Sequence, residues 1–405
     1  MSMIYLKNEF SELLNLIQYL CSKLYVYPFT GKSKNTLICY SIINILLLMT
    51  SLQLIVTLAM TDFGDWLEII NIAPNIGAVV VATVKYTIMY RNSQVYEEFM
   101  NHFQEDMWEL TNLNAEKSTQ VIIKYKNLTK FLIKFLCYFI AALIIVVDSF
   151  PFFIMMFESK ILGKELKYLY PYDAVYPFDK LDWYFVAYAW EGLMTAIVIL
   201  VHGTNTILNL SILLFMCMEL KLLGLGLRAL ITPEEIQCIV KRKRLEDTHK
   251  NIKLKLKLII RSYQYLDISF RKIKVDLEIV MSIGYKFGTV FICLTAFSAS
   301  VVDDLFKSLR YFSFCLSLLM DMFNLCVIGQ VVKDHSEDLS THTYFSEWTH
   351  ADAKTKNIIL MLLMRTQRPF ILTANGHVLM DLNTFADVCR ASYQYFNLLR
   401  TLYKP

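Results

Sequence analysis

The amino-acid sequence predicts an all-α, polytopic membrane protein with seven transmembrane helices. Of the 405 residues, 56% are hydrophobic and only 19% are charged. Glycine and proline, which interrupt helices, contribute only 12 and 8 residues. A soluble chain of this length usually carries more charge and more loop residues. We therefore expect long apolar helices joined by short loops.

Six of the predicted spans are visible as long apolar runs. Asn35–Thr61 and Gly192–Met218 contain no Asp, Glu, Lys or Arg, and a run of this length covers about 40 Å as a helix, enough to cross a bilayer. The other four runs each carry one charged residue, and they are Ile69–Tyr90 (Lys85), Phe135–Phe157 (Asp148), Ile279–Val302 (Lys286) and Tyr311–Val332 (Asp321). The seventh span, near the C-terminus, is the weakest by hydropathy.

The distribution of basic residues predicts the orientation of the chain. Segment 219–275 holds 14 Lys or Arg residues against 6 acids, whereas the predicted outer turns 61–65 and 302–304 are short and acidic. Because Lys and Arg stay on the cytoplasmic side, we expect a cytoplasmic N-terminus and, after seven crossings, an extracellular C-terminus. No cleavable signal peptide is expected, because the first apolar run is too long and starts too late.

These spans divide the chain into consecutive parts. Within the first part, Tyr5–Leu24 is expected to form an amphipathic helix on the inner membrane surface. The parts are a cytoplasmic segment (1–34), helices one to four (35–218) with an outer loop (158–182), a cytoplasmic helical anchor region (219–275), helices five and six (276–334), a cytoplasmic helix and turn (335–380) and the last helix (381–405).

Charged side chains within the spans are expensive in a bilayer, so each one needs an explanation. Lys85 and Lys286 lie near the predicted inner ends of their helices, and we expect them to extend toward the headgroups. Asp321 lies in the middle of its helix and needs a protein or water partner. Glu191 and Asp148 lie in outer halves, where lining a ligand cavity and pairing with another helix are both open.

The last predicted helix carries a polar stripe. Its members recur at steps of four, three, four, three and four, which places them on one helical face. Facing lipid they would be very costly, so they must face protein or water. Two alternatives remain: a polar seam packed on other helices, and the wall of a water-filled pore. The stripe consists of Asn383, Asp387, Arg390, Gln394, Asn397 and Thr401.

No motif for catalysis is present. The sequence has no glycine-rich phosphate loop, no nucleophile constellation and no histidine pair at metal-ligand spacing. The net charge of +4 is too small to indicate nucleic-acid binding. We therefore expect a protein that is not an enzyme, with no cofactor, no metal and no nucleic-acid partner.

The C-terminal third resembles the insect odorant receptor family. The resemblance rests on Arg368-Pro369, on Ala374 and Gly376 in a turn, on Thr384-Phe385, and on the closing stretch Ser392–Phe396. The outer-loop stretch PYDAVYPFD and segment 351–365, interpreted as a cytoplasmic helix, are also similar to the family. The motifs are specific only in the last 40 residues or so and in that loop.

The resemblance implies a subunit of an odorant-gated, nonselective cation channel in the plasma membrane of a sensory neuron dendrite. It implies a tetramer with a shared coreceptor, embedded in lipid, and a small volatile ligand. The chain lacks the insertion that marks the coreceptor, so it resembles a ligand-tuning subunit. The last helix of each subunit would line one central pore, with Leu398, Leu402, Thr401, Gln394, Asn397 and Arg390 at the pore or its gate.

The family's odorant pocket lies in the outer halves of helices two, three, four and six. Small apolar molecules would bind there by burial. Carried onto this chain, the resemblance indicates Ile69, Ala73, Ile76, Leu143, Val147, Phe150, Tyr188, Glu191, Met194, Thr195, Phe314, Cys315 and Leu318.

Three other classes of membrane protein share parts of this pattern. A gustatory receptor shares the architecture but has a different C-terminal signature. A G-protein-coupled receptor would have its N-terminus outside, and its usual Asp-Arg-Tyr and Asn-Pro-x-x-Tyr signatures are absent. A secondary transporter would need broken helices in paired positions, and no paired Gly/Pro interruptions support one.

Overall fold

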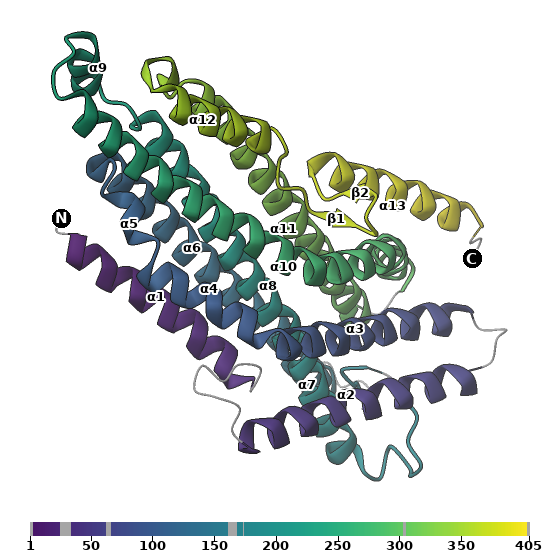
Figure 1. Cartoon of the computed structure of the whole chain (residues 1–405). Helices are drawn as coiled ribbons and strands as arrows, with labels where there is room; N and C mark the ends of the chain where they lie inside the picture. The colour runs from purple at the N-terminus through teal and green to yellow at the C-terminus, as the bar shows by residue number, and fades with distance from the viewer. Residues whose placement is uncertain are drawn as a thin grey trace.

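The computed structural model describes residues 3–24, 34–61, 66–160, 168–172, 174–302 and 305–402. It is an elongated bundle of helices (Figure 1). The elements are α1 (Met3–Lys23), α2 (Lys34–Met60), α3 (Trp66–Arg91), α4 (Ser93–Glu105), α5 (Trp108–Thr111), α6 (Ala115–Ile144), the π-helix η1 (Ile145–Ser149), α7 (Phe150–Lys160), α8 (Tyr184–Arg228), α9 (Pro233–Val240), α10 (Leu245–Val301), α11 (Leu305–Tyr344), the 3₁₀ helix η2 (Trp348–His350), α12 (Ala353–Thr366), β1 (Thr373–Ala374), β2 (Val378–Leu379) and α13 (Leu382–Leu402).

Within the described residues, six helical stretches are long and apolar enough to cross a membrane. They correspond to the six apolar runs predicted from the sequence, which confirms an all-α polytopic membrane protein. The polar stripe keeps α13 outside this set, so the seventh crossing and the orientation stay predictions. The six stretches are Lys34–Met60, Ile72–Arg91, Ala115–Phe157, Tyr184–Val240, Leu245–Val301 and Lys307–His350.

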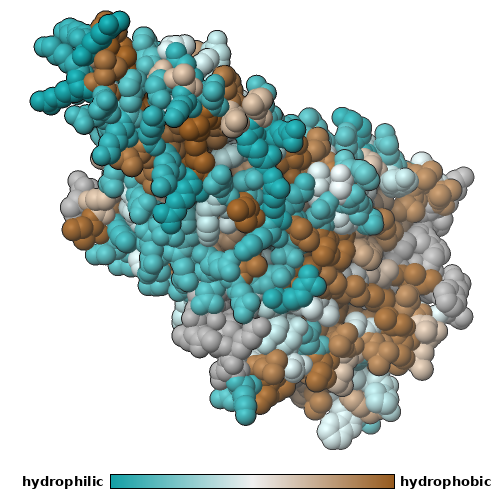
Figure 2. All heavy atoms as spheres, in the orientation of Figure 1, coloured by the Kyte–Doolittle hydropathy of each residue, from teal (hydrophilic) through white to brown (hydrophobic). Residues whose placement is uncertain are grey.

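The surface changes character along the molecule. Figure 2 shows a mainly hydrophilic surface at the end that holds α9 and α12, and a broad hydrophobic surface toward the end that holds α2 and α3. On α2 the exposed side chains include Ile38, Leu48 and Leu52, each at least half exposed. Such a contiguous apolar surface is what a bilayer covers.

The longest helices run through both of these zones without a break. α8 has 45 residues and α10 has 57, about 68 and 86 Å. The predicted boundaries at 218, 275 and 334 lie inside α8, α10 and α11. The membrane and cytoplasmic portions are therefore expected to be consecutive stretches of single helices, and their edges stay a prediction.

The N-terminal helix α1 corrects one expectation. The sequence predicted that its apolar face would lie on the inner membrane surface. Instead Leu6, Phe10, Leu14 and Ile17 are fully buried, because α1 packs against α4, α6 and α8. Protein therefore covers the apolar face of α1, and the prediction that this face contacts lipid is wrong.

A small hairpin precedes the last helix. β1 and β2 pair antiparallel around Asn375 and Gly376, whose φ angles are 54° and 73°. Two consecutive left-handed residues form the tight turn that Asn-Gly favours. Met380, the residue after β2, lies against α11. A Cβ on Gly329 of α11 would be 2.1 Å from the Met380 carbonyl oxygen. Only glycine permits this close approach of the two backbones.

Candidate functional site

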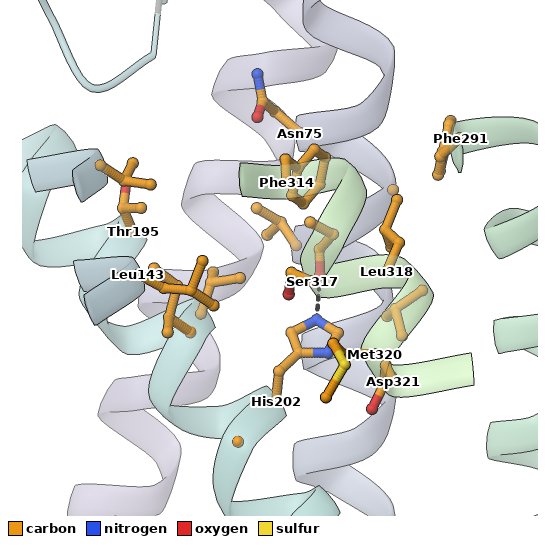
Figure 3. A pocket seen from close by; sticks show the side chains of 18 of the residues that line it. Asn75, Leu143, Thr195, His202, Phe291, Phe314, Ser317, Leu318, Met320 and Asp321 are labelled. Atoms are coloured by element: carbon orange, nitrogen blue, oxygen red, sulfur yellow. Dashed lines mark hydrogen bonds between the residues drawn. The ribbon is translucent and has the colours of Figure 1, made fainter. Parts of the chain in front are cut away.

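A cavity of about 190 Å³ lies between the helices. It is bounded by α2, α3, α6, η1, α8, α10 and α11, with Pro171 and Tyr172 of the outer loop above it. Figure 3 shows side chains from several of these helices converging on it, with Asn75 toward one end and His202 and Asp321 toward the other. An apolar cavity of about 150 Å³ accommodates benzene, so this one suits a slightly larger molecule.

The outer loop forms a fastened roof. The fully buried Glu191 carboxylate accepts hydrogen bonds from the Tyr172 amide at 3.0 Å and the Tyr176 hydroxyl at 3.2 Å. It also pairs with Lys180 Nζ at 3.3 Å. From the opposite side, the Arg310 guanidinium donates to the Pro171 carbonyl at 2.8 Å. Buried charges with this many partners hold the loop in one arrangement.

The walls are apolar and closely packed. Phe287, Phe291 and Phe314 contribute aromatic rings. A Cβ on Gly77 would lie 1.9 Å from the Phe291 ring, and a Cβ on Gly203 would lie 2.1 Å from Cδ1 of Ile140. These two glycines let neighbouring helices approach closely and so define the width of the cavity.

The floor is polar. Lys85 Nζ of α3 lies 2.6 Å from the Asp321 carboxylate of α11, and the Thr206 hydroxyl of α8 lies 2.8 Å from the other carboxylate oxygen. His202 Nδ1 lies 3.2 Å from Lys85 Nζ. The prediction that Asp321 needs a partner is confirmed. The prediction that Lys85 extends to the headgroups is wrong, because its side chain is only 2% exposed and is paired.

Six of the thirteen predicted pocket residues line this cavity: Leu143, Val147, Met194, Thr195, Phe314 and Leu318. Glu191 fastens the roof, the Cys315 thiol lies 3.8 Å from the Ile292 carbonyl, and the Tyr188 hydroxyl donates to the Asp148 carbonyl. Asp148 and Glu191 therefore both contact the elements around the cavity without lining it. The predicted residues that do not line it are Ile69, Ala73, Ile76, Phe150, Tyr188, Glu191 and Cys315.

One whole wall and most of the floor of the cavity lie outside the predicted pocket. Gly284, Phe287, Gly288 and Phe291 belong to α10, the fifth span, which the predicted pocket did not include. His202 was also missed. A histidine inside an otherwise uncharged span was the available signal for it.

The polar stripe of α13 faces away from the rest of the chain. α13 packs on α10 and α11 through Val388 and Ser392, its two buried residues. Asp387 and Arg390 pair at 2.8 Å, and both are 69% exposed. This pair forms within α13 at i, i+3 spacing, and the stripe is not a seam packed on helices of the same chain. Leu398, Leu402, Gln394 and Thr401 are also exposed, and Asn397 is half-buried.

A second buried acid–base pair lies outside the predicted membrane spans. His102 Nε2 of α4 lies 3.1 Å from the fully buried carboxylate of Glu219 on α8, and its ring stacks on Tyr265 at 3.8 Å. Burial alone would lower the pKa of His102. The hydrogen bond and charge of Glu219, together with the charge of Asp106, outweigh burial and raise the pKa of His102 above its usual value.

Long apolar helices, a mainly apolar cavity between them and a loop fastened above it define a helical membrane protein with an internal cavity. Comparison with known proteins gives its family. The family model described as "7tm Odorant receptor" matches residues 67–393, and the chain belongs to this family.

Individual relatives agree with this assignment. The chain is 29% identical to odorant receptor 85c and 28% identical to odorant receptor 85b of Drosophila melanogaster, each over 125 residues. These alignments cover 31% of this chain and 32% of each relative, so the similarity spans about a third of either protein.

Solved structures show the same fold over nearly the whole length. The insect olfactory receptor OR5 from Machilis hrabei superposes with a TM-score of 0.81, at 15% identity and covering 99% of both chains. Its complex with eugenol gives 0.79 with the same identity and coverage. At this identity the likeness establishes the fold alone.

Proposed function

We propose that this chain is the odorant-binding subunit of an odorant-gated, nonselective cation channel. The observation that carries the proposal is the cavity of about 190 Å³ between the helices, because its apolar walls suit a small apolar molecule. Membership of the odorant receptor family supports it, and so does the fold shared with OR5, which has been solved in complex with eugenol. The family match favours this function over the gustatory-type and G-protein-coupled alternatives.

The same proposal places the chain in the plasma membrane of a sensory neuron dendrite, with the coreceptor as its partner. The exposed stripe on α13 supports a role for this helix in a pore shared between subunits. Arg390 supports a mixed assembly: four copies around one axis would repel one another and passing cations, whereas fewer copies are tolerable. We expect little current from the chain alone and odorant-evoked current with the coreceptor. Robust evoked current without the coreceptor would contradict an obligate partner.

The ligand site is tested by voltage-clamp recording beside the coreceptor across a panel of volatiles. Phe314→Ala removes a ring from the cavity wall and should shift the concentration of ligand that gives half-maximal current. Phe312→Ala is the matched control, because this neighbouring side chain is 59% exposed on the surface of the same helix. Equal shifts in both variants, or none in either, would place the ligand elsewhere.

The orientation is tested separately. We expect an epitope after Pro405 to be stained without permeabilisation, and Asn127 to carry no glycan. Asn127 lies in α6, on the predicted cytoplasmic side. A glycan on Asn127 in the intact protein would reverse the proposed topology.

A further inference from the structure

The floor of the cavity carries information about the ligand that the apolar walls do not. Three helices meet there: Lys85 comes from α3, Thr206 from α8 and Asp321 from α11. Asp321 and Thr206 line the cavity, and Lys85 does not. The Lys85 side chain is 2% exposed and the Asp321 side chain is 29% exposed. Of the two charges, the negative one is therefore the one offered to a bound molecule.

The Asp321 carboxylate has unused acceptor capacity. An ionised carboxylate offers about four acceptor sites. Oδ2 accepts from Lys85 at 2.6 Å. Oδ1 has the Thr206 hydroxyl at 2.8 Å, but that hydroxyl also lies 3.0 Å from the His202 carbonyl and has one hydrogen to share between them. A further O–H or N–H donor can be accepted without displacing either partner.

His202, by contrast, has no capacity left. Its Nε2 lies 3.1 Å from the Ala78 carbonyl, and because a carbonyl only accepts, Nε2 must carry the hydrogen. Nδ1 then accepts from the Lys85 ammonium at 3.2 Å. Both ring nitrogens are occupied, so among these floor residues the group left to meet a ligand is the acceptor Asp321.

We propose that this cavity recognises small, mainly apolar molecules that carry one hydrogen-bond donor, a hydroxyl or an amino group, and that Asp321 is the residue that accepts it. This inference rests on the proposed function of the cavity as the ligand site. A hydrogen bond to a charged acceptor contributes roughly ten- to hundredfold in affinity. Loss of the charge with retention of the shape should cost about tenfold of that, because an amide oxygen still accepts.

The test uses the full chain in lipid nanodiscs and four probes with the same number of non-hydrogen atoms: benzyl alcohol, benzylamine, anisole and ethylbenzene. The first two donate a hydrogen bond, as a neutral hydroxyl and a charged ammonium respectively, and the last two do not. Affinity is obtained from the rise in melting temperature with probe concentration. The readout is the ratio of the affinity of each donor to that of anisole. The solvation of each probe in water is the same for every protein variant, so it cancels when the ratios of two variants are compared.

In Asp321→Asn this ratio should fall about tenfold for at least one donor. A fall for benzyl alcohol alone indicates a neutral hydroxyl ligand, and a fall for benzylamine alone indicates a cationic one. Lys85→Gln/Asp321→Asn removes both charges, leaves neither buried alone, and should give the same fall if the single variant does not fold. Glu219→Gln is the matched control, since it makes the same acid-to-amide change at a fully buried acid in the packed part of α8, away from the cavity.

Two outcomes overturn the inference in distinguishable ways. If the probes bind but their ratios are the same in wild type, Asp321→Asn and the double variant, Asp321 only balances Lys85, and the cavity remains the ligand site. If no probe raises the melting temperature of the wild type, the cavity is not the site of small-molecule binding, and the proposed function fails with the inference.

Discussion

The two halves of α8 differ in how their side chains are covered. In the outer half, Tyr184, Ala187, Glu191, Met194, Val198 and Val201 are buried at alternating steps of three and four, and the other faces are more open. From Ile207 to Leu227 nearly every residue is buried, whichever face it occupies. The same helix is therefore a one-sided wall at the cavity and a central core element further along.

This difference separates the room for a ligand from the source of rigidity. A helix buried on one side leaves space for neighbours to bound a cavity, whereas a helix buried all round is close-packed and resists volume changes. The two acid–base pairs follow the same division. Asp321 of the Lys85 pair borders the cavity, and the His102–Glu219 pair lies in packed surroundings. We expect the outer half to determine ligand affinity and the inner half to determine stability.

The largest expected effect is a loss of stability from the inner half. Phe215 is fully buried in α8, so Phe215→Ala should cost about 3–5 kcal/mol through the cavity it creates. Phe185→Ala changes the same residue type on the same helix at a position that is 75% exposed, and should cost far less. Melting of the purified protein compares the two. Similar losses would contradict the contrast between the halves.

A smaller effect is expected at the cavity wall. Gly77→Ala should force the Phe291 ring to move, at about 1–3 kcal/mol, and lower ligand affinity by changing the cavity shape. Gly288→Ala is the matched control: Gly288 also lines the cavity, but an added Cβ there meets nothing within 4 Å. Ligand-dependent melting of both variants is the measurement. A larger loss of affinity in Gly288→Ala would be inconsistent with this wall.

The His102–Glu219 pair predicts a modest pH dependence of stability. The pKa of His102 in the folded state is raised above the unfolded value of about 6.5. The stabilisation is therefore fully present below about pH 6.5 and is lost as pH rises through the folded-state pKa. We expect the melting temperature to decline by a few degrees over that interval. Glu219→Gln should flatten this part of the profile, and an unchanged slope would show that the pair does not contribute.

The smallest effect on stability is expected on α13. Leu398 is 53% exposed, so Leu398→Ala should change the free energy of unfolding by no more than about 0.5 kcal/mol. Beside the coreceptor it should raise the resting current, because trimming an apolar constriction lowers the barrier to wetting. Leu402→Ala should act likewise, and replacing Gln394 or Thr401 should alter ion selectivity. Leu399→Ala, at a half-buried position, is the matched control. An unchanged resting current at normal surface expression would remove α13 from the pore wall.

The sequence located the apolar spans along the chain far better than the direction in which each residue faces around its helix. Hydropathy located six spans and placed Asp321 mid-helix correctly. It did not reveal that Lys85 pairs with Asp321, because the two are 236 positions apart and nothing local distinguishes a lysine that faces protein from one that extends along lipid. Glu191 shows the same limit: the sequence left its role open between cavity and helix pairing, and in the structure its carboxylate is bound by the loop above the cavity.

The sequence also did not predict what covers each helix face. The apolar face of α1 was evident from its periodicity, but a periodic pattern does not say whether lipid or protein covers it. The contribution of α10 to the cavity depends on Gly77 admitting the Phe291 ring, a contact between two distant spans. The stripe of α13 was fully predictable because its 3.6-residue period is a local property.

The contact at Gly329 couples α11 mechanically to the start of α13. Gly329 lies eight residues beyond Asp321, about 12 Å along one unbroken helix. At Gly329 the backbone of α11 contacts the backbone of Met380, which leads into α13. Between Asp321 and Gly329, the Phe323 ring packs edge to face on Phe385 of α13, with 5.3 Å between the ring centroids. A displacement of α11 along its axis at the cavity floor should therefore displace the start of α13 by a similar amount, because no long side chain separates the two backbones at Gly329.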